Sequence, residues 1–379
     1  MKKQIQNSFC IADTKIMRRL LRLANSQKGL TSPNPITAAA IVDKSGEIIS
    51  EGVHSEFGGP HAEALAIKKA GIKAKGCTIY VNLEPCTHTG KNPPCTDLII
   101  EAGIKKVIYA IDDPNPLVRK ISAKTILNKA GIKVESGLLH EEALLINEVF
   151  IKNQTKKLPF VVMKVGTSLD GKIALANGKS KYITAIKSQK KVHKIRRELD
   201  AILVGVGTIV KDDPALNIRH TLLKPGYKNP VKIILDSKAR TPLDAKIFNE
   251  NKDTKIIIAT TRAANKNKVQ LLKKKAEIWI LPNNRTAICW NSLLKKAYKE
   301  EIMSILIEGG NQVYTSALAA GVIDKLYLFQ APKIIAEEKA LSIFSGENIS
   351  SLNNVNNLRI VSSKKCGPDI CITAYFEKK

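Results

Sequence analysis

The chain has 379 residues, 44% of them hydrophobic, and its 61 Lys and Arg against 34 Asp and Glu give a formal net charge of +27. This length exceeds one ordinary hydrophobic core and predicts two domains. No stretch approaches the ~20 apolar residues of a membrane span, and the N-terminal segment lacks the apolar region of a signal peptide. Seven cysteines without an export signal argue against a disulfide framework, so we expect a cytoplasmic protein.

The large positive charge is the feature that most suggests nucleic-acid binding. However, its lysines are scattered through predicted helices and loops, and no aromatic residues alternate with basic ones as base stacking requires. We interpret the charge as solvated lysine side chains that also attract phosphorylated small molecules. We therefore expect neither nucleic acid nor a membrane as a partner.

The first part of the chain, residues 1–152, alternates short apolar runs with helical patterns. Such alternation predicts a sheet with helices on both faces. The predicted helices cover 17–28, 61–71, 95–103, 118–131 and 141–152, and the predicted strands cover 36–42, 47–53, 77–83, 105–111 and 132–137.

A polar segment ending in proline, residues 153–158, is the predicted linker to a second domain over 159–379. The second domain is also of the α/β class. Its predicted strands cover 160–166, 201–207, 231–237, 255–260, 277–281, 304–310, 325–333 and a final edge strand over 371–377, with helices over 188–199 and 291–300.

A set of metal-ligand residues stands out in the first domain: His61-Ala-Glu63, then Cys86 after a proline, then Cys95. Zinc deaminases use one His and two Cys as ligands, with a glutamate that is not a ligand. A catalytic zinc keeps one position for water and lowers the pKa of that water to about 7. One carboxylate must then move a proton from the water to the departing nitrogen. The pattern therefore predicts a zinc held by His61, Cys86 and Cys95, with Glu63 as the catalytic acid and base.

The spacing of these residues also predicts where they lie on helices. Residues two apart point roughly 200° apart in mid-helix, so His61 and Glu63 can share a site only at the first turn. Pro60 before His61 fits such a helix start, and Pro94 before Cys95 fits a second one. The alternative is a structural zinc, which would need a fourth Cys or His at short spacing, and none is evident.

With these residues in view, the sequence resembles the bifunctional RibD-type deaminase/reductase of riboflavin biosynthesis over nearly its whole length. Cys86 and Cys95 enclose THTGKNPP, whereas zinc deaminases of nucleobases or tRNA typically have two residues between the cysteines. The resemblance implies a cytidine-deaminase-like three-layer α/β/α domain followed by a dihydrofolate-reductase-like α/β domain. It also implies one zinc per chain, NADPH as cofactor, and a homo-oligomer.

The resemblance implies the reactions as well. The first is hydrolytic deamination of 2,5-diamino-6-(5-phosphoribosylamino)pyrimidin-4(3H)-one to 5-amino-6-(5-phosphoribosylamino)uracil. The second is NADPH-dependent reduction of the ribosyl group to ribityl. The deaminase pocket would be lined by Asn34, His54, His88 and Lys91. Asn34 alone could be a turn residue, and Lys91 a solvated loop charge.

One departure from the family pattern lies next to Asn34. The family usually has Val and Gly where this chain has Thr37 and Ala38, on a strand beside the substrate. An added methyl group where the backbone approaches a ligand would narrow the pocket. The departure bears on the fit of the substrate and leaves the metal ligands intact.

For the reductase half, glycine-rich strand ends let backbone N–H groups approach a pyrophosphate, and a following helix N-terminus adds its dipole. The chain lacks the G-x-G-x-x-G fingerprint of the Rossmann fold, so the residue roles follow from the resemblance. On the substrate side it implies Ser180, Arg196, Leu216, Arg219 and Glu308, with both arginines gripping a phosphate. On the cofactor side it implies Gly166, Tyr182, Thr208, Asp212, Ser237, Gly310, Asn311, Gln312, Val313, Tyr314, Thr315 and Ser316. Taken singly, Arg196 could be a surface helix charge, Tyr182 a packing residue and the glycines ordinary turns.

Two other hypotheses remain open at this point. The first is a deaminase of RNA or of a free base, for which the net charge of +27 is the motive. The second is a deaminase whose C-terminal half binds nucleotide without turning it over. Release of ammonia from tRNA would favour the first, and NADPH binding without oxidation would favour the second.

Overall fold

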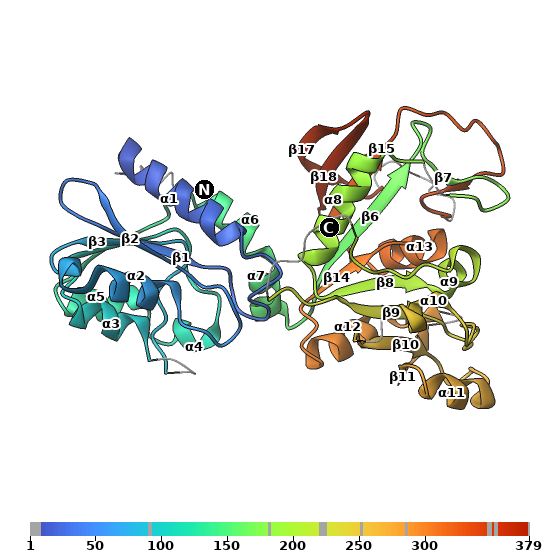
Figure 1. Cartoon of the computed structure of the whole chain (residues 1–379), viewed down its shortest axis with the longest axis horizontal. Helices are drawn as coiled ribbons and strands as arrows, with labels where there is room; N and C mark the ends of the chain where they lie inside the picture. The colour runs from blue at the N-terminus through green and yellow to red at the C-terminus, as the bar shows by residue number, and fades with distance from the viewer. Residues whose placement is uncertain are drawn as a thin grey trace. The chain divides into compact units, whose positions relative to one another are not determined.

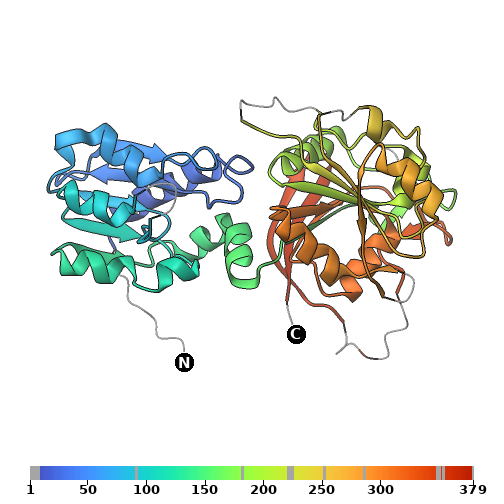
Figure 2. The ribbon, with the colours of Figure 1, turned by 90° about the horizontal axis from the view of Figure 1, so that it is seen from below.

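The computed structural model describes residues 9–89, 93–180, 183–219, 226–250, 253–284, 287–346, 351 and 355–377. The chain divides into two compact units, Met1–Lys157 and Leu158–Lys379. Each is built on a sheet with helices packed against it (Figures 1 and 2), as the sequence predicts. Within the described residues, none of the helices has the length and apolar character needed to span a membrane.

The first unit contains a five-stranded sheet in the order β2-β1-β3-β4-β5, and β1 runs antiparallel to both of its neighbours. Side chains of β1 alternate between two separate buried clusters, one on each face, because both faces are covered by helices. The strands are β1 (Ala38–Val42), β2 (Ile48–Val53), β3 (Thr78–Val81), β4 (Lys106–Tyr109) and β5 (Lys133–Ser136).

The helices of this unit are α1 (Ile11–Asn25), α2 (Ala62–Ala70), α3 (Cys95–Glu101), α4 (Pro116–Arg119), α5 (Ala123–Lys129), α6 (His140–Ile146) and α7 (Glu148–Lys156), with a 3₁₀ turn over Gly71–Ala74. Helix α1 begins six residues before the predicted start, because Cys10 and Asp13 form a capping box. The predicted helix over 118–131 is broken where Ser122 caps α5.

The predicted helix over 141–152 is two helices, α6 and α7, that meet at Asn147. Asn147 sits at the junction because its side chain accepts a hydrogen bond from the Ile36 backbone N–H at 3.0 Å and donates one to the Ile36 carbonyl at 3.1 Å. The segment 153–158, predicted as a linker, is helical as far as Lys156, and Lys157 ends the helix with a φ of 55°.

The second unit contains a nine-stranded sheet in the order β11-β10-β9-β8-β14-β6-β15-β18-β17. Strands from β11 to β15 run parallel, and β18 and β17 close the sheet as an antiparallel ribbon. The strands are β6 (Phe160–Thr167), β8 (Ala201–Gly205), β9 (Val231–Leu235), β10 (Ile256–Thr260), β11 (Glu277–Ile280), β14 (Ser304–Ile307), β15 (Lys325–Gln330), β17 (Leu358–Cys366) and β18 (Asp369–Phe376).

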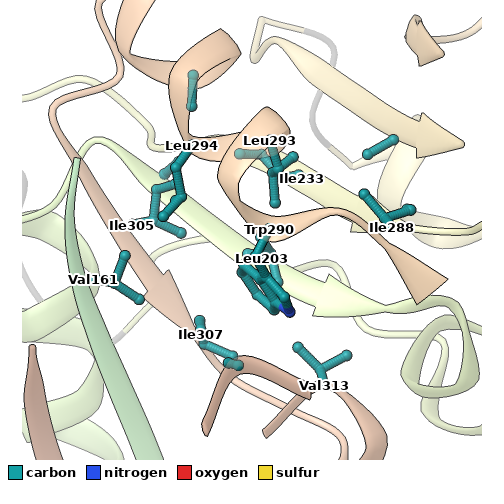
Figure 3. Packing of buried hydrophobic residues seen from close by; sticks show 14 of the residues in the cluster. Val161, Leu203, Ile233, Ile288, Trp290, Leu293, Leu294, Ile305, Ile307 and Val313 are labelled. Atoms are coloured by element: carbon teal, nitrogen blue, oxygen red, sulfur yellow. The ribbon is translucent and has the colours of Figure 1, made fainter. Parts of the chain in front are cut away.

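Two short antiparallel pairs lie outside this sheet: β7 (Lys172–Ala174) with β16 (Leu341–Ser342), and β12 (Asn283–Asn284) with β13 (Ala287–Ile288). The helices are α8 (Ile186–Arg197), α9 (Val206–Asp212), α10 (Lys246–Asn249), α11 (Lys266–Lys273), α12 (Trp290–Lys299) and α13 (Asn311–Ala319). One face of the sheet forms the main core with α12 and α13. Figure 3 shows Leu203, Ile233, Ile305 and Ile307 of that face with Trp290 and Leu293 of α12 and Val313 of α13.

The prediction of 371–377 as the edge strand is wrong. Strand β18 lies between β15 and β17, and β17 occupies the edge. The sequence of β17, LRIVSSKKC, gave no strand signal because most of its side chains are exposed and polar. The predicted strand over 201–207 also ends earlier, since α9 begins at Val206.

Candidate functional site

His61, Cys86 and Cys95 come together in the first unit. One ligand atom from each lies within 4.8 Å of the other two. The His61 Nδ1 atom is 3.3 Å from the Cys95 Sγ and 3.5 Å from the Cys86 Sγ. Within the described residues this is the one group of three or more His, Cys, Asp or Glu side chains close enough to hold a metal ion.

These distances fit a tetrahedral zinc. With Zn–N near 2.05 Å and Zn–S near 2.3 Å, tetrahedral ligands lie about 3.6 Å apart. The observed His–Cys separations are within a few tenths of an ångström of that value. One imidazole and two sulfurs leave a fourth position for water, which is the ligand set of a catalytic site.

The local sequence explains how the ligands are placed. His61 is the N-cap of α2 with extended backbone angles, and Glu63 follows in the first turn, as the spacing predicts. Cys95 is the first residue of α3, after Pro94 at the N-cap. The Cys95 backbone N–H donates to the Cys86 sulfur at 3.3 Å, so the start of α3 stabilises a thiolate at Cys86.

The two cysteine sulfurs differ in acidity because they contact each other. The hydrogen bond from Cys95 is the largest effect that lowers the pKa of Cys86, and His61 adds to it. The same contact, together with burial and the Glu63 carboxylate, raises the pKa of Cys95. The contact with Cys86 raises the pKa of His61. The charge distribution therefore favours anionic sulfur beside a nitrogen donor, as a divalent metal requires.

Glu63 is only 5% exposed and lies beside the cluster. Burial, and after it the Cys86 sulfur, raise the pKa of Glu63 to about 7. A carboxyl group with a pKa near neutrality can both accept and return a proton. This is the behaviour that the proton transfer in deamination needs.

A second group of polar side chains adjoins the metal ligands. The His54 ring lies edge-on to the His61 ring, with 5.8 Å between the ring centroids. Burial lowers the pKa of His54, so the ring is neutral; its Nδ1–H donates to the Pro60 carbonyl at 3.0 Å. The Nε2 atom then accepts from the Asn34 side-chain amide at 3.0 Å. Two predicted pocket residues, Asn34 and His54, are thus joined to each other and to the metal site.

The other predicted pocket residues are less completely placed. The His88 Nδ1 atom is buried and has no hydrogen-bond partner in the described residues, so it is available to a ligand. Lys91 lies outside the described residues. Thr37 and Ala38, the departures from the family pattern, are both buried, and Ala38 is the first residue of β1.

Sequence reasoning missed the residues that hold this part of the site in place. Asn82 accepts from the Ala38 backbone N–H at 2.7 Å and donates to the Ile36 carbonyl at 3.0 Å. Glu84 accepts from the Asp113 and Ala123 backbone N–H groups at 3.1 and 2.8 Å, just before the loop that carries Cys86. A buried Asn or Glu placed next to a motif is the only sequence signal for such a role, and it is weak.

In the second unit, several predicted residues lie at the carboxyl ends of neighbouring parallel strands, where α/β sheets bind ligands. Thr208 stands after β8, with its Oγ1 next to Gly309 and Gly310 at the end of β14. Gly166 lies near the end of β6, and Ser237 follows β9. The structure therefore brings Gly166, Thr208, Ser237 and Gly310 to one edge of the sheet.

The centre of that edge is an ion-pair cluster on Glu308. The Arg196 Nε and Nη2 atoms donate to the two Glu308 oxygens at 2.5 and 2.8 Å, and the Lys164 Nζ lies 3.3 Å from one of them. Burial alone would raise the pKa of Glu308, but Arg196 and Lys164 hold it well below its usual range. Arg196 also donates to the Asn217 carbonyl at 2.9 Å.

This geometry changes what is expected of Arg196. The Nε and Nη2 groups of its guanidinium, which were expected to bind a phosphate, donate to Glu308 instead. Only the remaining guanidinium N–H groups are therefore available to a ligand. Lys164, which the sequence analysis did not single out as a site residue, is part of the same cluster.

In the predicted cofactor segment at the start of α13, several side chains make contacts within the protein. The Val313 side chain packs into the core, the Tyr314 hydroxyl donates to the Lys164 carbonyl, and the Ser316 hydroxyl donates to the Val313 carbonyl. Asn311 and Thr315 bind the segment around Ser345. These side chains are engaged, so a cofactor here would be held mainly by backbone N–H groups of the first turn.

The remaining predicted residues are placed as follows: Ser180, Thr208, Asp212 and Ser237 are partly exposed, Leu216 is buried, Gln312 and Arg219 are exposed, and Tyr182 lies outside the described residues.

Comparison with known proteins agrees with this geometry. Residues 11–111 match the family described as the cytidine and deoxycytidylate deaminase zinc-binding region, and residues 159–372 match the RibD C-terminal domain. The chain is 42% identical to the riboflavin biosynthesis protein RibD of Aquifex aeolicus, over 95% of this chain and 97% of the relative. It is 33% identical to RibD of Escherichia coli, over 95% of this chain and 98% of the relative.

Solved structures give the same result. A deaminase/reductase from Thermotoga maritima superimposes with a TM-score of 0.82 at 36% identity, covering 96% of this chain and 98% of that one. RibD of Acinetobacter baumannii gives a TM-score of 0.84 at 30% identity, covering 97% and 99%. The zinc-ligand geometry, the two α/β units and these matches along the whole chain lead to one conclusion: the chain belongs to the RibD family of riboflavin biosynthesis proteins.

Proposed function

We propose that this protein is a bifunctional enzyme that first deaminates 2,5-diamino-6-(5-phosphoribosylamino)pyrimidin-4(3H)-one and then reduces the ribosyl group of the product. The deaminase domain spans 1–152 and the reductase domain 159–379. The observation that carries the proposal is the metal-ligand triad with the buried Glu63 beside it. The same chain also matches the RibD C-terminal domain over residues 159–372, which supports the second reaction.

In the deamination, Glu63 takes the proton from water and returns it to the nitrogen that leaves as ammonia. Zinc, when held by His61, Cys86 and Cys95, supplies the Lewis acidity that makes water nucleophilic at neutral pH. The pKa of Glu63, raised to about 7 by its burial, suits both halves of the transfer. Asn34 and His54 form a polar side of the substrate pocket. Their mutual hydrogen bond and the His54 bond to the Pro60 carbonyl hold both side chains in place.

In the reduction, NADPH supplies the hydride when bound, and the protein orients the ribosyl carbon against it and excludes water. Glu308, Arg196 and Lys164 hold one another in place and form a charged surface on the substrate side of the site. The first turn of α13 offers backbone N–H groups to the cofactor phosphates. Hydride transfer itself does not demand a general acid or base from the protein.

We also propose that the protein acts on small phosphorylated pyrimidines in the cytoplasm and does not act on nucleic acid. All seven cysteines are free thiols, and two of them are assigned to the metal, which suits a reducing compartment.

A homo-oligomer is supported by strand β17. It is a nine-residue edge strand with Leu358, Ile360 and Val361 exposed by 41, 62 and 39%. These three apolar side chains lie in the first half of an otherwise polar strand, and an unpaired strand edge with exposed apolar residues favours pairing with another chain. Ile360→Lys should shift the mass measured by light scattering toward the monomer, and an unchanged mass would rule out this edge as the interface.

The function is tested by assaying both half-reactions on one purified sample. Supplying the diaminopyrimidine nucleotide should release ammonia, and adding NADPH should then give NADPH oxidation in equal amount. Ammonia release from tRNA but not from the nucleotide would favour an RNA deaminase. NADPH binding without oxidation would leave the second domain as a binding module only.

A further inference from the structure

Lys232 is a buried cation that the proposed function leaves without a role. It is the second residue of β9, and its side chain is 0% exposed. Its Nζ atom has no hydrogen-bond partner in the part of the chain that the structure describes. An ammonium group buried without an acceptor destabilises a fold, and an apolar residue of similar size would remove that cost. Folding alone therefore does not account for a lysine at this position.

The strand register places Lys232 on the same face of the sheet as the ion-pair cluster. Lys232 pairs with Ile202 of β8, and Ile202 pairs with Leu306 of β14. Paired residues of parallel strands point to the same side, and so do residues two apart in one strand. Glu308 follows Leu306 by two residues, with its backbone N–H still bonded to the Leu203 carbonyl of β8. Lys232 and Glu308 therefore share a face.

Lys164 belongs to this face as well, since Leu306 pairs with Val162 of β6, two residues before Lys164. The opposite face carries the apolar cluster with Ile233, the next residue of β9 (Figure 3). Two strand spacings and two residues of rise separate Lys232 from Glu308, about 12 Å between Cα atoms. At that separation Lys232 interacts electrostatically with both Glu308 and Arg196.

The charges around Lys232 are unbalanced. Arg196 of α8 and Lys164 of β6 already share the single carboxylate of Glu308. Burial, and after it the positive charge of Arg196, lower the pKa of Lys232 to about 7, while Glu308 acts in the opposite direction. Two other titratable groups belong to the elements around this cluster. His193, one turn before Arg196 on α8, accepts from the Arg219 backbone N–H. Asp200, whose carbonyl accepts from the Val231 backbone N–H of β9, accepts through its carboxylate from Ser304 and Met303.

We propose that Lys232 is a positioning residue of the reductase site that takes up a proton when the phosphate of the substrate binds beside Arg196 and Arg219. A phosphate near Arg196 offsets the repulsion between the positive charges of Arg196 and Lys232. The protonated form of the Lys232 amine is then favoured over the neutral form. The charged amine in turn strengthens the field that holds the phosphate. The inference rests on the proposed function in one respect, namely that a phosphate binds on this side of Glu308.

The proton uptake can be measured directly by calorimetry with ribose 5-phosphate as the probe. Binding to the full chain is measured at pH 8 in Tris and in HEPES, whose ionisation enthalpies differ. At this pH the phosphate is already a dianion and contributes no proton of its own. The wild type should take up roughly half a proton per site or more, and its affinity should fall roughly tenfold between pH 7 and 9.

Three variants separate this role from simple packing. Lys232→Met should abolish both the uptake and the pH dependence of affinity, and its melting temperature should stay level or rise. Lys232→Arg keeps the charge at every pH, so it should bind ribose 5-phosphate without proton uptake. Lys228→Met, an exposed lysine on the segment that leads into β9, is the matched control and should behave as the wild type.

Each contrary outcome has a distinct meaning. Ribose 5-phosphate that binds with no proton uptake in the wild type overturns the inference and leaves the proposed function standing. Proton uptake that persists in Lys232→Met also overturns it, because another group then takes the proton. Proton uptake on binding of NADP⁺ but not of ribose 5-phosphate would show that a cofactor phosphate causes the uptake. This result would overturn the assignment to the substrate phosphate. A failure of ribose 5-phosphate to bind at all would contradict the proposed phosphate site itself.

Discussion

At the scale of single residues, two buried glutamates acquire opposite properties from their surroundings. Glu63 is buried next to a cysteine sulfur, and burial raises its pKa to about 7. Glu308 is as deeply buried, but Arg196 and Lys164 hold its pKa well below the usual range. The first can exchange a proton at neutral pH and the second is a permanent anion. The surroundings thus make one glutamate suited to proton transfer and the other to holding two cations.

Replacing Glu308 by Gln should destabilise the second unit by about 3–5 kcal/mol, because two partly buried cations lose their shared partner. Since folding depresses the carboxyl pKa, the stability contributed by Glu308 is fully present above pH ~4.5 and is lost progressively as the pH falls from there toward the depressed pKa. The variant should therefore melt at a lower temperature at pH 7 and lose less stability on acidification. Thermal melts at pH 7 and pH 3.5 check this; equal acid sensitivity of the two proteins would contradict it.

The sequence predicted the metal ligands and Glu63 because residue type and spacing alone define that chemistry. It could not predict the partners that act through space. Lys164 meets Glu308 only because β6 and β14 are neighbours in the sheet, and those strands are far apart along the chain. The Arg196 fork was expected to bind phosphate, and nothing in its local sequence indicates that Glu308 occupies it.

At the scale of helices and strands, the site depends on where elements begin. His61 and Cys95 both lie at the start of a helix. A proline precedes each of them, and this signal can be recognised in the sequence. The breaks at Ser122 and Asn147 were missed, since helical periodicity continues across them. Asn147 interrupts its helix through bonds to Ile36, a residue 111 positions away. Such long-range contacts override local propensity.

A close approach between β8 and α13 offers a test at this scale. A Cβ atom added at Gly205 would lie 2.7 Å from Val313 Cγ2, and a valine in a helix has little rotamer freedom to move away. Gly205→Ala should therefore shift α13, cost about 1–3 kcal/mol and weaken NADPH binding.

Gly207→Ala is the matched control, two residues further along the chain. A Cβ atom there meets nothing within 4 Å, and the residue lies in α9, where alanine is favoured over glycine. Melting temperature and the quenching of protein fluorescence by NADPH measure both effects. Equal behaviour of the two variants would show that α13 is not packed against β8 as described.

At the scale of the whole molecule, the two units have separate cores and separate sites. The apolar clusters of the first unit and the core of the second share no residue. The sequence predicted this division into two α/β halves, because each half carries its own series of strands and helices. It did not predict that helix α7 fills most of the expected linker, since the polar residues 153–156 read as a loop and are helical.

Independent sites predict independent responses to the loss of metal. Treatment of the full chain with a zinc chelator should abolish ammonia release, and added Zn²⁺ should restore it. NADPH oxidation with the deaminated substrate should continue throughout, because the Glu308 cluster contains no metal ligand set. Parallel loss of both activities on chelation would contradict the separation of the sites.

The most direct test of the account is Glu63→Gln, with zinc content, ammonia release and NADPH oxidation measured on one sample. The variant should retain about one zinc per chain and its NADPH oxidation, while ammonia release should fall by about 10²–10⁴-fold. Loss of the zinc together with the activity would show that Glu63 is a ligand, and undiminished ammonia release would show that the proton moves by another route. Either result would contradict the role assigned to the buried carboxylate.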